Sequence, residues 1–430
     1  MFGKLANSFW ATAEYAWYPI LLLLSTPWFL DRLGAEQYGS WMLMNATIGL
    51  GGVLTVGTGA ATIKFISASR DRDPATIAEP IRVSLGIAIV GGGALALIVA
   101  SVFLLGGTSL LSRMGSTSNI HWIGCSAALL IWIEQIDSVF SSSMKGFEKF
   151  NLSAIVEMSA KTLQVLAALL AATWLSSVDA VFVALIGTAI VRLIAKMIIL
   201  RLVFHIRGIR PSLKSASAIF HWAKWGWLQG IGGVLFNAGD RLIVGSILGA
   251  ASLAYYSIAL QIAMQIHSIG SAFLSVVFPR ASRILAMDAQ VSLKRLIVVT
   301  LAGNFALSSA LAAFAWFLGP PLIIHWTRDP QSPAVALLYP LIFCYWLLSL
   351  NVAPHYMLLG MGRVRFVGLV SLISGLIGII AAFSAIHYLG ITGAPAGRAA
   401  YGVASLALLA PILGILVRGN PIRQVTPGST

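Results

Sequence analysis

The stretch VSLGIAIVGGGALALIVASVFLL, residues 83–105, runs for 23 residues without one charged side chain. A helix of about 20 apolar residues crosses the hydrocarbon core of a bilayer, so this stretch predicts a membrane-spanning helix. The whole chain has the same character, because 58% of its 430 residues are hydrophobic and only 10% are charged. Soluble domains carry about 25% charged residues. The composition therefore excludes an ordinary soluble enzyme and a disordered chain.

Apolar runs of similar length recur along the chain and predict an all-α polytopic membrane protein with about twelve spanning helices. Their ranges are 11–30, 40–63, 83–105, 121–142, 153–175, 180–203, 226–247, 253–279, 297–318, 336–358, 367–389 and 394–416. Because twelve is an even number, both termini are expected on the same side of the membrane. The longest outer connections lie near 106–120 and 319–335. The longest inner connection, 201–225, predicts a short amphipathic helix at the membrane surface.

The net charge of +14 could reflect either nucleic-acid binding or membrane topology. Twenty of the 28 Lys and Arg residues fall in loops on the side of the N-terminus, three fall on the other side, and five lie within predicted spans. Positive residues concentrate on the cytoplasmic side of membrane proteins, so both termini are expected in the cytoplasm. Topology explains the charge, and no nucleic-acid partner is predicted.

An internal repeat divides the chain near its middle. Leu33-Gly34-Ala35 recurs as Leu248-Gly249-Ala250 at an offset of 215 residues, and two weaker matches follow at offsets of 213 and 214. The chain is therefore expected to form two six-helix lobes, 1–215 with helices 1–6 and 216–430 with helices 7–12. Because six is even, the lobes insert in the same orientation, as in transporters that bind substrate between two halves.

Several motifs resemble one family of membrane proteins. The string FLDRLGAEQYGSW at 29–41 resembles the first outer loop of polysaccharide transporters, and FNAGDRLIVGSILGAASLAYYSIALQI at 236–262 is similar to their seventh and eighth helices. VFPRASR at 277–283 and LLGMGRVRF at 358–366 also fit. The resemblance covers nearly the whole chain. It points to Wzx-type O-antigen flippases of the multidrug/oligosaccharidyl-lipid/polysaccharide (MOP) exporter superfamily.

The resemblance implies a fold, a location and an activity. The fold is twelve helices in two bundles around a central cavity, in the inner membrane of a bacterium. The activity is translocation, by alternating access, of an oligosaccharide linked through pyrophosphate to undecaprenol, from the cytoplasmic to the periplasmic leaflet, for O-antigen and lipopolysaccharide biosynthesis. No cofactor is implied. H⁺ or Na⁺ is a candidate coupling ion, and a polysaccharide polymerase and a chain-length regulator are candidate partners.

Ionisable residues within the predicted spans are the candidate site residues, because charges inside a membrane must pair, line water or lie near an interface. They are Glu14, Glu134, Asp137, Glu157, Lys161, Arg192, Lys196, Asp240, Arg241 and Arg398. The five basic residues are candidates for a cationic, substrate-binding cavity. The five acidic residues are candidates for coupling or gating, and Glu14, low on the first helix, is a candidate site for the coupling ion.

Spacing along the helices leaves several arrangements open. Arg192 and Lys196 are four residues apart without an acidic partner on their own helix, which suits a dianionic pyrophosphate. Lys196 could instead extend its ammonium group to the membrane surface. Glu134 and Asp137 share a face and cannot both ionise at low cost, which makes them a candidate proton carrier. The alternative is that they pair with Arg192 or Lys161 on a neighbouring helix.

Two further groups of charged residues are ambiguous in the same way. Glu157 and Lys161 are four residues apart and are expected either to neutralise each other or to contribute to a site. Asp240 and Arg241 lie toward the outer end of one predicted helix, and Arg398 near the outer start of another. These three are candidates for lobe-to-lobe gating pairs or for interfacial anchors.

The chain lacks the motifs of soluble enzymes. It has no GxxxxGK[ST] loop, no HExxH and no CxxC pair, so no catalytic residue, metal or enzymatic activity is expected. Two other functions stay open. A cation-coupled multidrug exporter of the same superfamily would need an apolar, acidic cavity. A membrane glycan polymerase or lipid-linked glycosyltransferase would need a larger outer loop.

Overall fold

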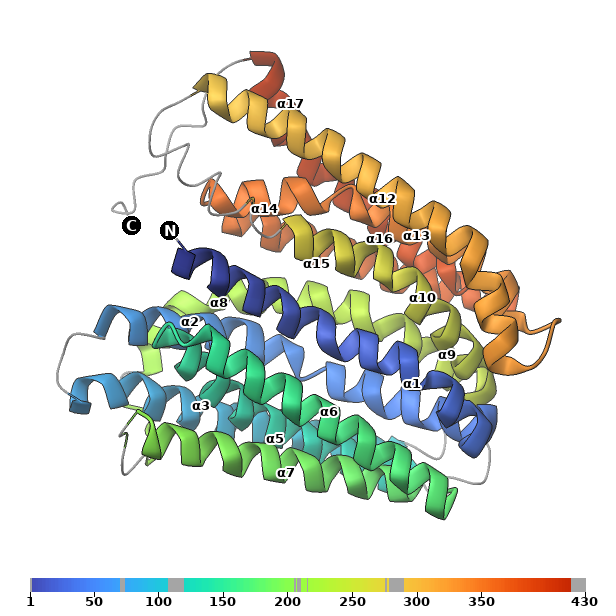
Figure 1. Cartoon of the computed structure of the whole chain (residues 1–430), viewed down its shortest axis with the longest axis horizontal. Helices are drawn as coiled ribbons and strands as arrows, with labels where there is room; N and C mark the ends of the chain where they lie inside the picture. Colours follow the sequence, from blue (N-terminus) through green and yellow to red (C-terminus); the bar gives the residue numbers. More distant parts are fainter. Residues whose placement is uncertain are drawn as a thin grey trace.

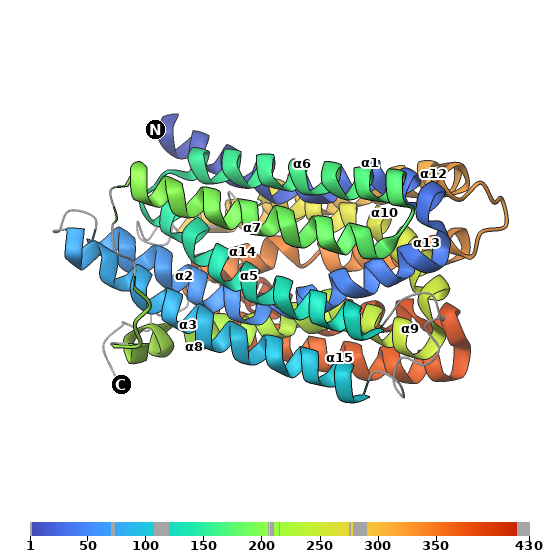
Figure 2. The ribbon, with the colours of Figure 1, turned by 90° about the horizontal axis from the view of Figure 1, so that it is seen from below.

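The computed structural model describes residues 2–69, 74–106, 120–204, 206, 210–214, 216–274, 277 and 290–418. Within these ranges the chain forms helices and no strands, which confirms the all-α prediction. The helices lie side by side as one long bundle (Figure 1, Figure 2). We call the end of the bundle where the first helix begins the amino-terminal side, and the other end the opposite side.

The first half of the chain supplies six long helices. They are α1 (Phe2–Gly49), α2 (Gly52–Ser69), α3 (Pro74–Ser101) with a following π turn (Val102–Gly106), α5 (Ile120–Gly146), α6 (Phe150–Leu175) and α7 (Val178–Leu202). In Figure 1 these helices, coloured blue to green, occupy the lower part of the bundle.

The second half has more interruptions. Its elements are α8 (Ala216–Val234), a π turn (Leu235–Gly239), α9 (Asp240–Leu248), α10 (Ala250–Leu274), α12 (Gln290–Thr327), α13 (Pro333–Ser349), α14 (Val352–Gly360), α15 (Val364–Leu389), α16 (Pro395–Ser405) and α17 (Leu409–Arg418), with short 3₁₀ turns on either side of α16. Helices α12 to α17 fill the upper part of Figure 1, and α8 and α10 lie between the two groups.

In the described residues, ten helices are long and apolar enough to cross a membrane, and the bent pair Trp17–Gly49 and Gly52–Ser67 raises this number to eleven. Helix α1 itself contains a reversal at Gly34, whose φ of 72° and ψ of 172° are not helical. Counted on either side of Gly34, the described helices cross the bundle twelve times, in agreement with the predicted number.

The reversal at Gly34 has a counterpart at Gly249. Gly249 lies between α9 and α10 with a φ of 87° and a ψ of 178°, nearly the values of Gly34. A positive φ of this kind favours glycine because no Cβ is present to clash. These two glycines belong to the sequence match at offset 215, so that match corresponds to two turns of the same shape. The lobe boundary at 215 stays a prediction.

Two predicted connections are wrong. Helix α12 continues through Pro320 and Pro321 to Thr327, so the expected outer loop 319–335 shrinks to residues 328–332. Residues 216–225 are the first turns of α8 and not a separate surface helix. The start of α8 stays helical because Ile219 and Ala223 pack in one buried apolar cluster with residues of α2 and α3. Most of the third predicted connection, 106–120, lies outside the described residues.

Helices α1 and α10 join the two halves through backbone contact and buried hydrogen bonds. A Cβ atom at Gly39 would lie 1.9 Å from the carbonyl oxygen of Ala250, so only glycine permits this approach. Gln261 of α10 accepts a hydrogen bond from the Thr26 hydroxyl (2.8 Å) and donates one to the Tyr38 hydroxyl (2.7 Å).

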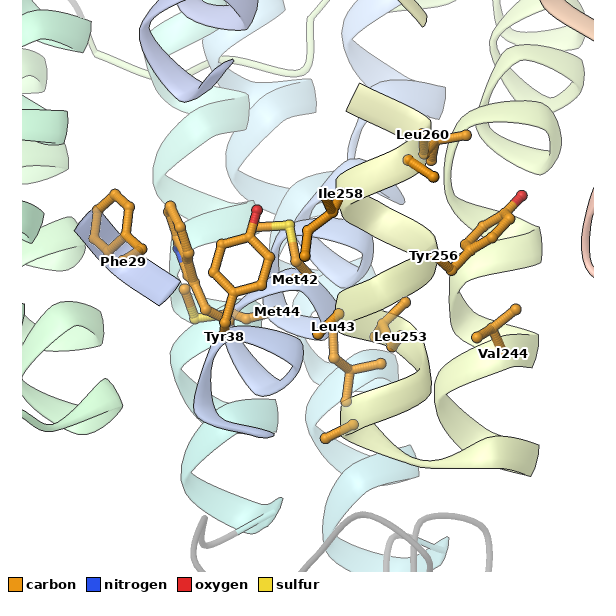
Figure 3. Packing of buried hydrophobic residues seen from close by; sticks show 14 of the residues in the cluster. Phe29, Tyr38, Met42, Leu43, Met44, Val244, Leu253, Tyr256, Ile258 and Leu260 are labelled. Carbon is orange, nitrogen blue, oxygen red and sulfur yellow. The ribbon is translucent and has the colours of Figure 1, made fainter. Parts of the chain in front are cut away.

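Apolar packing surrounds this junction. Figure 3 shows Tyr38 and Met42 of α1 facing Ile258 of α10, and all three side chains are buried. Phe29, earlier in α1, packs against Trp41 with ring centroids 4.2 Å apart. The halves therefore meet at this junction through buried apolar side chains, beside the polar contacts of Gln261.

Candidate functional site

Six of the ten predicted residues gather between α5, α6 and α7, and we call them the six-residue cluster. Helix α5 contributes Glu134 and Asp137, α6 contributes Glu157 and Lys161, and α7 contributes Arg192 and Lys196. Three carboxylates face three cations, so the cluster is formally neutral when all six are ionised.

Lys196 is the most enclosed member of the six-residue cluster. Its side chain is 0% exposed, and its Nζ lies 2.7 Å from Asp137 Oδ2 and 2.5 Å from Glu157 Oε2. It also donates a hydrogen bond to the Ser141 hydroxyl at 2.7 Å. Lys196 therefore does not extend to the membrane surface, which corrects that expectation.

Arg192 reaches all three carboxylates of the cluster. Its nitrogens lie 3.3 Å from Asp137, 3.5 Å from Glu157 and 3.6 Å from Glu134. The spacing of Arg192 and Lys196 indicated two unpaired cations that could bind a pyrophosphate. In the structure, carboxylates of the neighbouring helices α5 and α6 pair with both cations. The arrangement matches the alternative in which Glu134 and Asp137 pair across to α7.

The pair expected within α6 is also rearranged. Glu157 contacts Lys196 and Arg192 of α7, whereas the ammonium group of Lys161 lies 3.8 Å from Glu134. Lys161 also stands 4.7 Å from the centre of the Tyr18 ring on α1, a cation–π contact. Lys161 is thus the member of the cluster that faces the first helix.

A second group of charges lies entirely in the second half of the chain. Arg398 of α16 makes a two-point contact with Asp240 of α9, with Nε–Oδ2 at 2.6 Å and Nη2–Oδ1 at 3.0 Å. Tyr256 donates to Asp240, and Arg398 donates to the hydroxyl of Tyr345. Asp240 and Arg398 are 4% and 3% exposed. Asp240 and Arg398 thus pair with each other within the second half of the chain, and a part for them in lobe-to-lobe gating stays a prediction.

Glu14 has a partner at the amino-terminal side. Its Oε1 lies 2.7 Å from the Nζ of Lys145, and the two side chains are 15% and 24% exposed. This ion pair connects α1 to the last turn of α5. Glu14 is therefore engaged in a contact between helices, whether or not it also takes part in coupling.

Arg241 differs from the other four basic candidates. Its guanidinium Nε donates to the carbonyl oxygen of Asn237, one turn earlier, at 3.1 Å. All five basic candidates lie in the described part of the chain, and Arg241 is the one whose side chain has no carboxylate partner there. An arginine held by a neutral carbonyl keeps its full positive charge available.

Three cavities that share lining residues lie near the junction of the halves; the first and third are lined by both halves, and the second by the first half alone. The largest, of about 530 Å³, is lined mainly by the second half, and we call it the large cavity. A second cavity of about 270 Å³ includes Lys161 and Glu134, and a third of about 210 Å³ includes Arg241. The second and third share Tyr18 and Asn45 in their linings, so we treat them together as the charged cavity.

Of the residues predicted for a cationic cavity, the structure therefore brings Lys161 and Arg241 to the charged cavity. Arg192, Lys196 and Arg398 are held in buried ion pairs. Neutral polar residues that the sequence analysis did not single out also line it: Tyr18, Asn45, Gln164, Ser257 and Gln261. No sequence signal identified them, because uncharged polar residues inside a span also satisfy ordinary helix contacts. In the described residues, no group of three or more His, Cys, Asp or Glu side chains could hold a metal ion.

A bundle of membrane-spanning helices that encloses polar cavities is the architecture typical of a membrane transporter. Residues 5–285 match the family described as polysaccharide biosynthesis protein, and residues 230–384 match the MatE family. The chain belongs to the polysaccharide biosynthesis protein family, within the MOP superfamily that the motifs at 29–41 and 236–262 indicated.

Two relatives are similar in sequence over part of their length. A protein of Shigella flexneri named as an O-antigen transporter is 25% identical over 282 residues, which cover 65% of this chain and 66% of that protein. A protein of Haloferax volcanii named as a flippase is 23% identical over 289 residues, 66% of this chain and 56% of that protein. The matches thus span 66% and 56% of the relatives' own lengths.

Two solved structures share the fold over nearly the whole chain. An inward-facing multidrug resistance transporter of the MATE family and MOP superfamily has a TM-score of 0.68 at 17% identity, with 95% of this chain and 100% of that chain covered. A MOP superfamily transporter from Pyrococcus furiosus has a TM-score of 0.66 at 16% identity, with 97% and 96% covered. These likenesses establish the twelve-helix, two-lobe fold.

Proposed function

We propose that the protein is a flippase for oligosaccharide linked through pyrophosphate to undecaprenol. It would move this lipid from the cytoplasmic to the periplasmic leaflet by alternating access, for O-antigen or other surface-polysaccharide biosynthesis. The family membership and the two named relatives support this proposal. The observation that carries it is Arg241, a cation without a carboxylate partner in the described residues that lines the charged cavity.

Charge balance explains why Arg241 is the best candidate for the pyrophosphate. The six-residue cluster is neutral, and Arg398 is neutralised by Asp240, so neither presents excess positive charge to an anion. Arg241 presents an excess positive charge, and its planar guanidinium can donate two parallel hydrogen bonds to a phosphate. Lys161 is the second candidate, because its 3.8 Å separation from Glu134 is the longest ion pair in the cluster.

Replacing Arg241 with glutamine should slow translocation about 10- to 100-fold, the usual effect of losing a hydrogen bond to a charged group. Arg241→Lys keeps the charge but loses the planar pair of donors, so a smaller loss is expected. The measurement is transfer of the lipid-linked oligosaccharide across proteoliposomes. Arg201→Gln, at an exposed arginine of α7, is the matched control. Unchanged transfer by Arg241→Gln would remove Arg241 from the site.

A cation-coupled multidrug exporter is the second candidate function, because residues 230–384 match the MatE family. Such an exporter needs a carboxylate facing its cavity. Glu134 lines the charged cavity, but Arg192 and Lys161 already contact it. A dye-efflux assay separates the two functions, since efflux that depends on Glu134 would favour the exporter. Coupling to H⁺ or Na⁺ stays a prediction for either function.

We also propose that the chain forms no glycan bond itself and acts on lipid-linked glycan alongside a polymerase and a chain-length regulator. The two relatives are named as an O-antigen transporter and a flippase, which supports this view. Detection of new glycan linkages after incubation of the purified protein with lipid-linked oligosaccharide would contradict it.

The positive-inside asymmetry predicts how the protein lies in a bacterial inner membrane. A green fluorescent protein fused after Thr430 should fluoresce, because that fusion partner folds in the cytoplasm. Alkaline phosphatase inserted within residues 328–332 should be active, because it requires the periplasm. The opposite pattern from both reporters would reverse the proposed orientation.

A further inference from the structure

We infer that the large cavity binds uncharged sugar rings, as a site distinct from the charged cavity. This inference rests on the proposed function and adds a second ligand-binding region to it. The large cavity measures about 530 Å³, within the range of about 300–1,000 Å³ for ligand pockets. Its lining, which lies wholly in the described residues, contains no Asp, Glu, Lys or Arg side chain.

Buried polar atoms without partners line the large cavity. Asn351 is 4% exposed, and its amide nitrogen donates to the Ser405 hydroxyl at 2.6 Å, which fixes the orientation of the amide. Among the residues that the structure describes, the amide oxygen of Asn351 and the Nδ1 of His267 have no hydrogen-bond partner. Buried polar atoms are normally satisfied, and a buried atom left without a partner destabilises the folded protein. These two atoms therefore call for a hydrogen-bonding occupant.

The remaining lining suits a polyhydroxylated ring. Side-chain amides of Gln229 and Asn237 add donors and acceptors from α8 and the following π turn. Phe236 and Tyr401 lie side by side with ring centroids 4.4 Å apart, which gives an aromatic wall. Sugar rings present hydroxyl groups at their edges and C–H groups on their faces, so they need both kinds of contact at once.

Other occupants fit less well. A cationic drug would require a carboxylate, and a phosphate would require a cation, but the lining holds neither. A polyprenyl chain would leave the amides and Asn351 unsatisfied. The large cavity and the charged cavity share Gly49 and Gly52 in their linings, so a pyrophosphate held near Arg241 and the sugar attached to it could occupy both spaces.

The test compares two probes on the full-length protein in nanodiscs. One probe is undecaprenyl pyrophosphate, which has no sugar. The other is lipid-linked oligosaccharide extracted from the source strain after deletion of this protein. We expect Asn351→Leu and Asn237→Leu to weaken binding of the oligosaccharide probe about tenfold each, as for a lost neutral hydrogen bond, without changing the binding of undecaprenyl pyrophosphate. Arg241→Gln should weaken binding of both probes.

One control variant and one fallback variant make the result decisive. Gln265→Leu, in α10 but not among the residues lining the large cavity, should leave both affinities unchanged. Asn351 also donates to Ser405, so Asn351→Leu could fail to fold. In that case Asn237→Leu decides alone, because the side-chain amide of Asn237 donates to the Gly233 carbonyl one turn earlier. Unchanged oligosaccharide binding, or equal weakening for both probes, overturns the sugar site but leaves the proposed function standing. A wild-type protein that binds neither probe overturns both.

Discussion

Lys196→Met should destabilise the folded protein by about 3–5 kcal/mol, the usual effect of removing one partner of a buried ion pair. Lys196 is 0% exposed and contacts both Asp137 and Glu157 at 2.7 Å or less. Without its ammonium group, two carboxylates remain buried beside each other with only Arg192 to balance them. Thermal unfolding of the detergent-solubilised protein, followed by loss of monodisperse material, measures the effect.

The companion variants separate charge from packing. Lys196→Met combined with Glu157→Gln removes one charge of each sign and should recover part of the lost stability. Lys214→Met, at an exposed lysine before α8, should have little effect. A Lys196→Met protein as stable as wild type would mean that the six-residue cluster contributes nothing to the fold.

Arg192 belongs to the same cluster, which changes what its substitution tests. If Arg192 were a free contact for the pyrophosphate, Arg192→Ala would lower translocation while the protein stayed folded. In the structure Arg192 is 4% exposed and meets three carboxylates. We therefore expect a loss of folded protein together with any loss of transport.

Arg398→Leu should produce a loss of similar size, about 3–5 kcal/mol, because it leaves Asp240 ionised and buried without its cation. Arg398 donates two hydrogen bonds to Asp240 and a third to Tyr345, and its guanidinium lies 4.6 Å from the ring centre of Phe236. These contacts hold α16 against α9 and α13. The same unfolding measurement in detergent applies.

Substitutions at both ends of this contact provide the check. Asp240→Asn with Arg398→Leu removes both charges, and most of the stability should return, since a buried ion pair contributes little beyond a neutral replacement. Arg398→Lys keeps one charge but not the two-point geometry and should fall between wild type and Arg398→Leu. A double variant less stable than Arg398→Leu alone would contradict this account.

The ten intramembrane charges show where sequence reasoning succeeds. Their rarity in apolar runs was enough to select them, and nine of the ten have ion-pair partners in the structure. Spacing along one helix did not predict those partners. Glu157 pairs with Arg192 and Lys196 on α7 and not with Lys161 on its own helix. Arg398 pairs with Asp240, which lies on a helix distant in the sequence.

Arg241 shows the opposite difficulty. From the sequence it is one of five basic candidates for the substrate-binding cavity. Arg192 was the stronger candidate for the pyrophosphate, because Lys196 lies four residues further along the same helix. Only the contacts of all five reveal that Arg241 alone, among the described basic candidates, has no carboxylate partner. The large cavity could not be predicted from the sequence, because its amide and hydroxyl side chains resemble those that pack between helices in any membrane protein.

The sequence by itself determined the membrane-spanning runs, the side expected for the termini, and the turns at Gly34 and Gly249. Each of these depends on local properties: the length of an apolar run, the count of positive charges in a loop, or a glycine that permits positive φ. The tertiary structure decided which charges are neutralised and which space is left between the halves. Those depend on helix neighbours that no local pattern specifies, because a buried charge is balanced by whichever carboxylate the packing brings within reach.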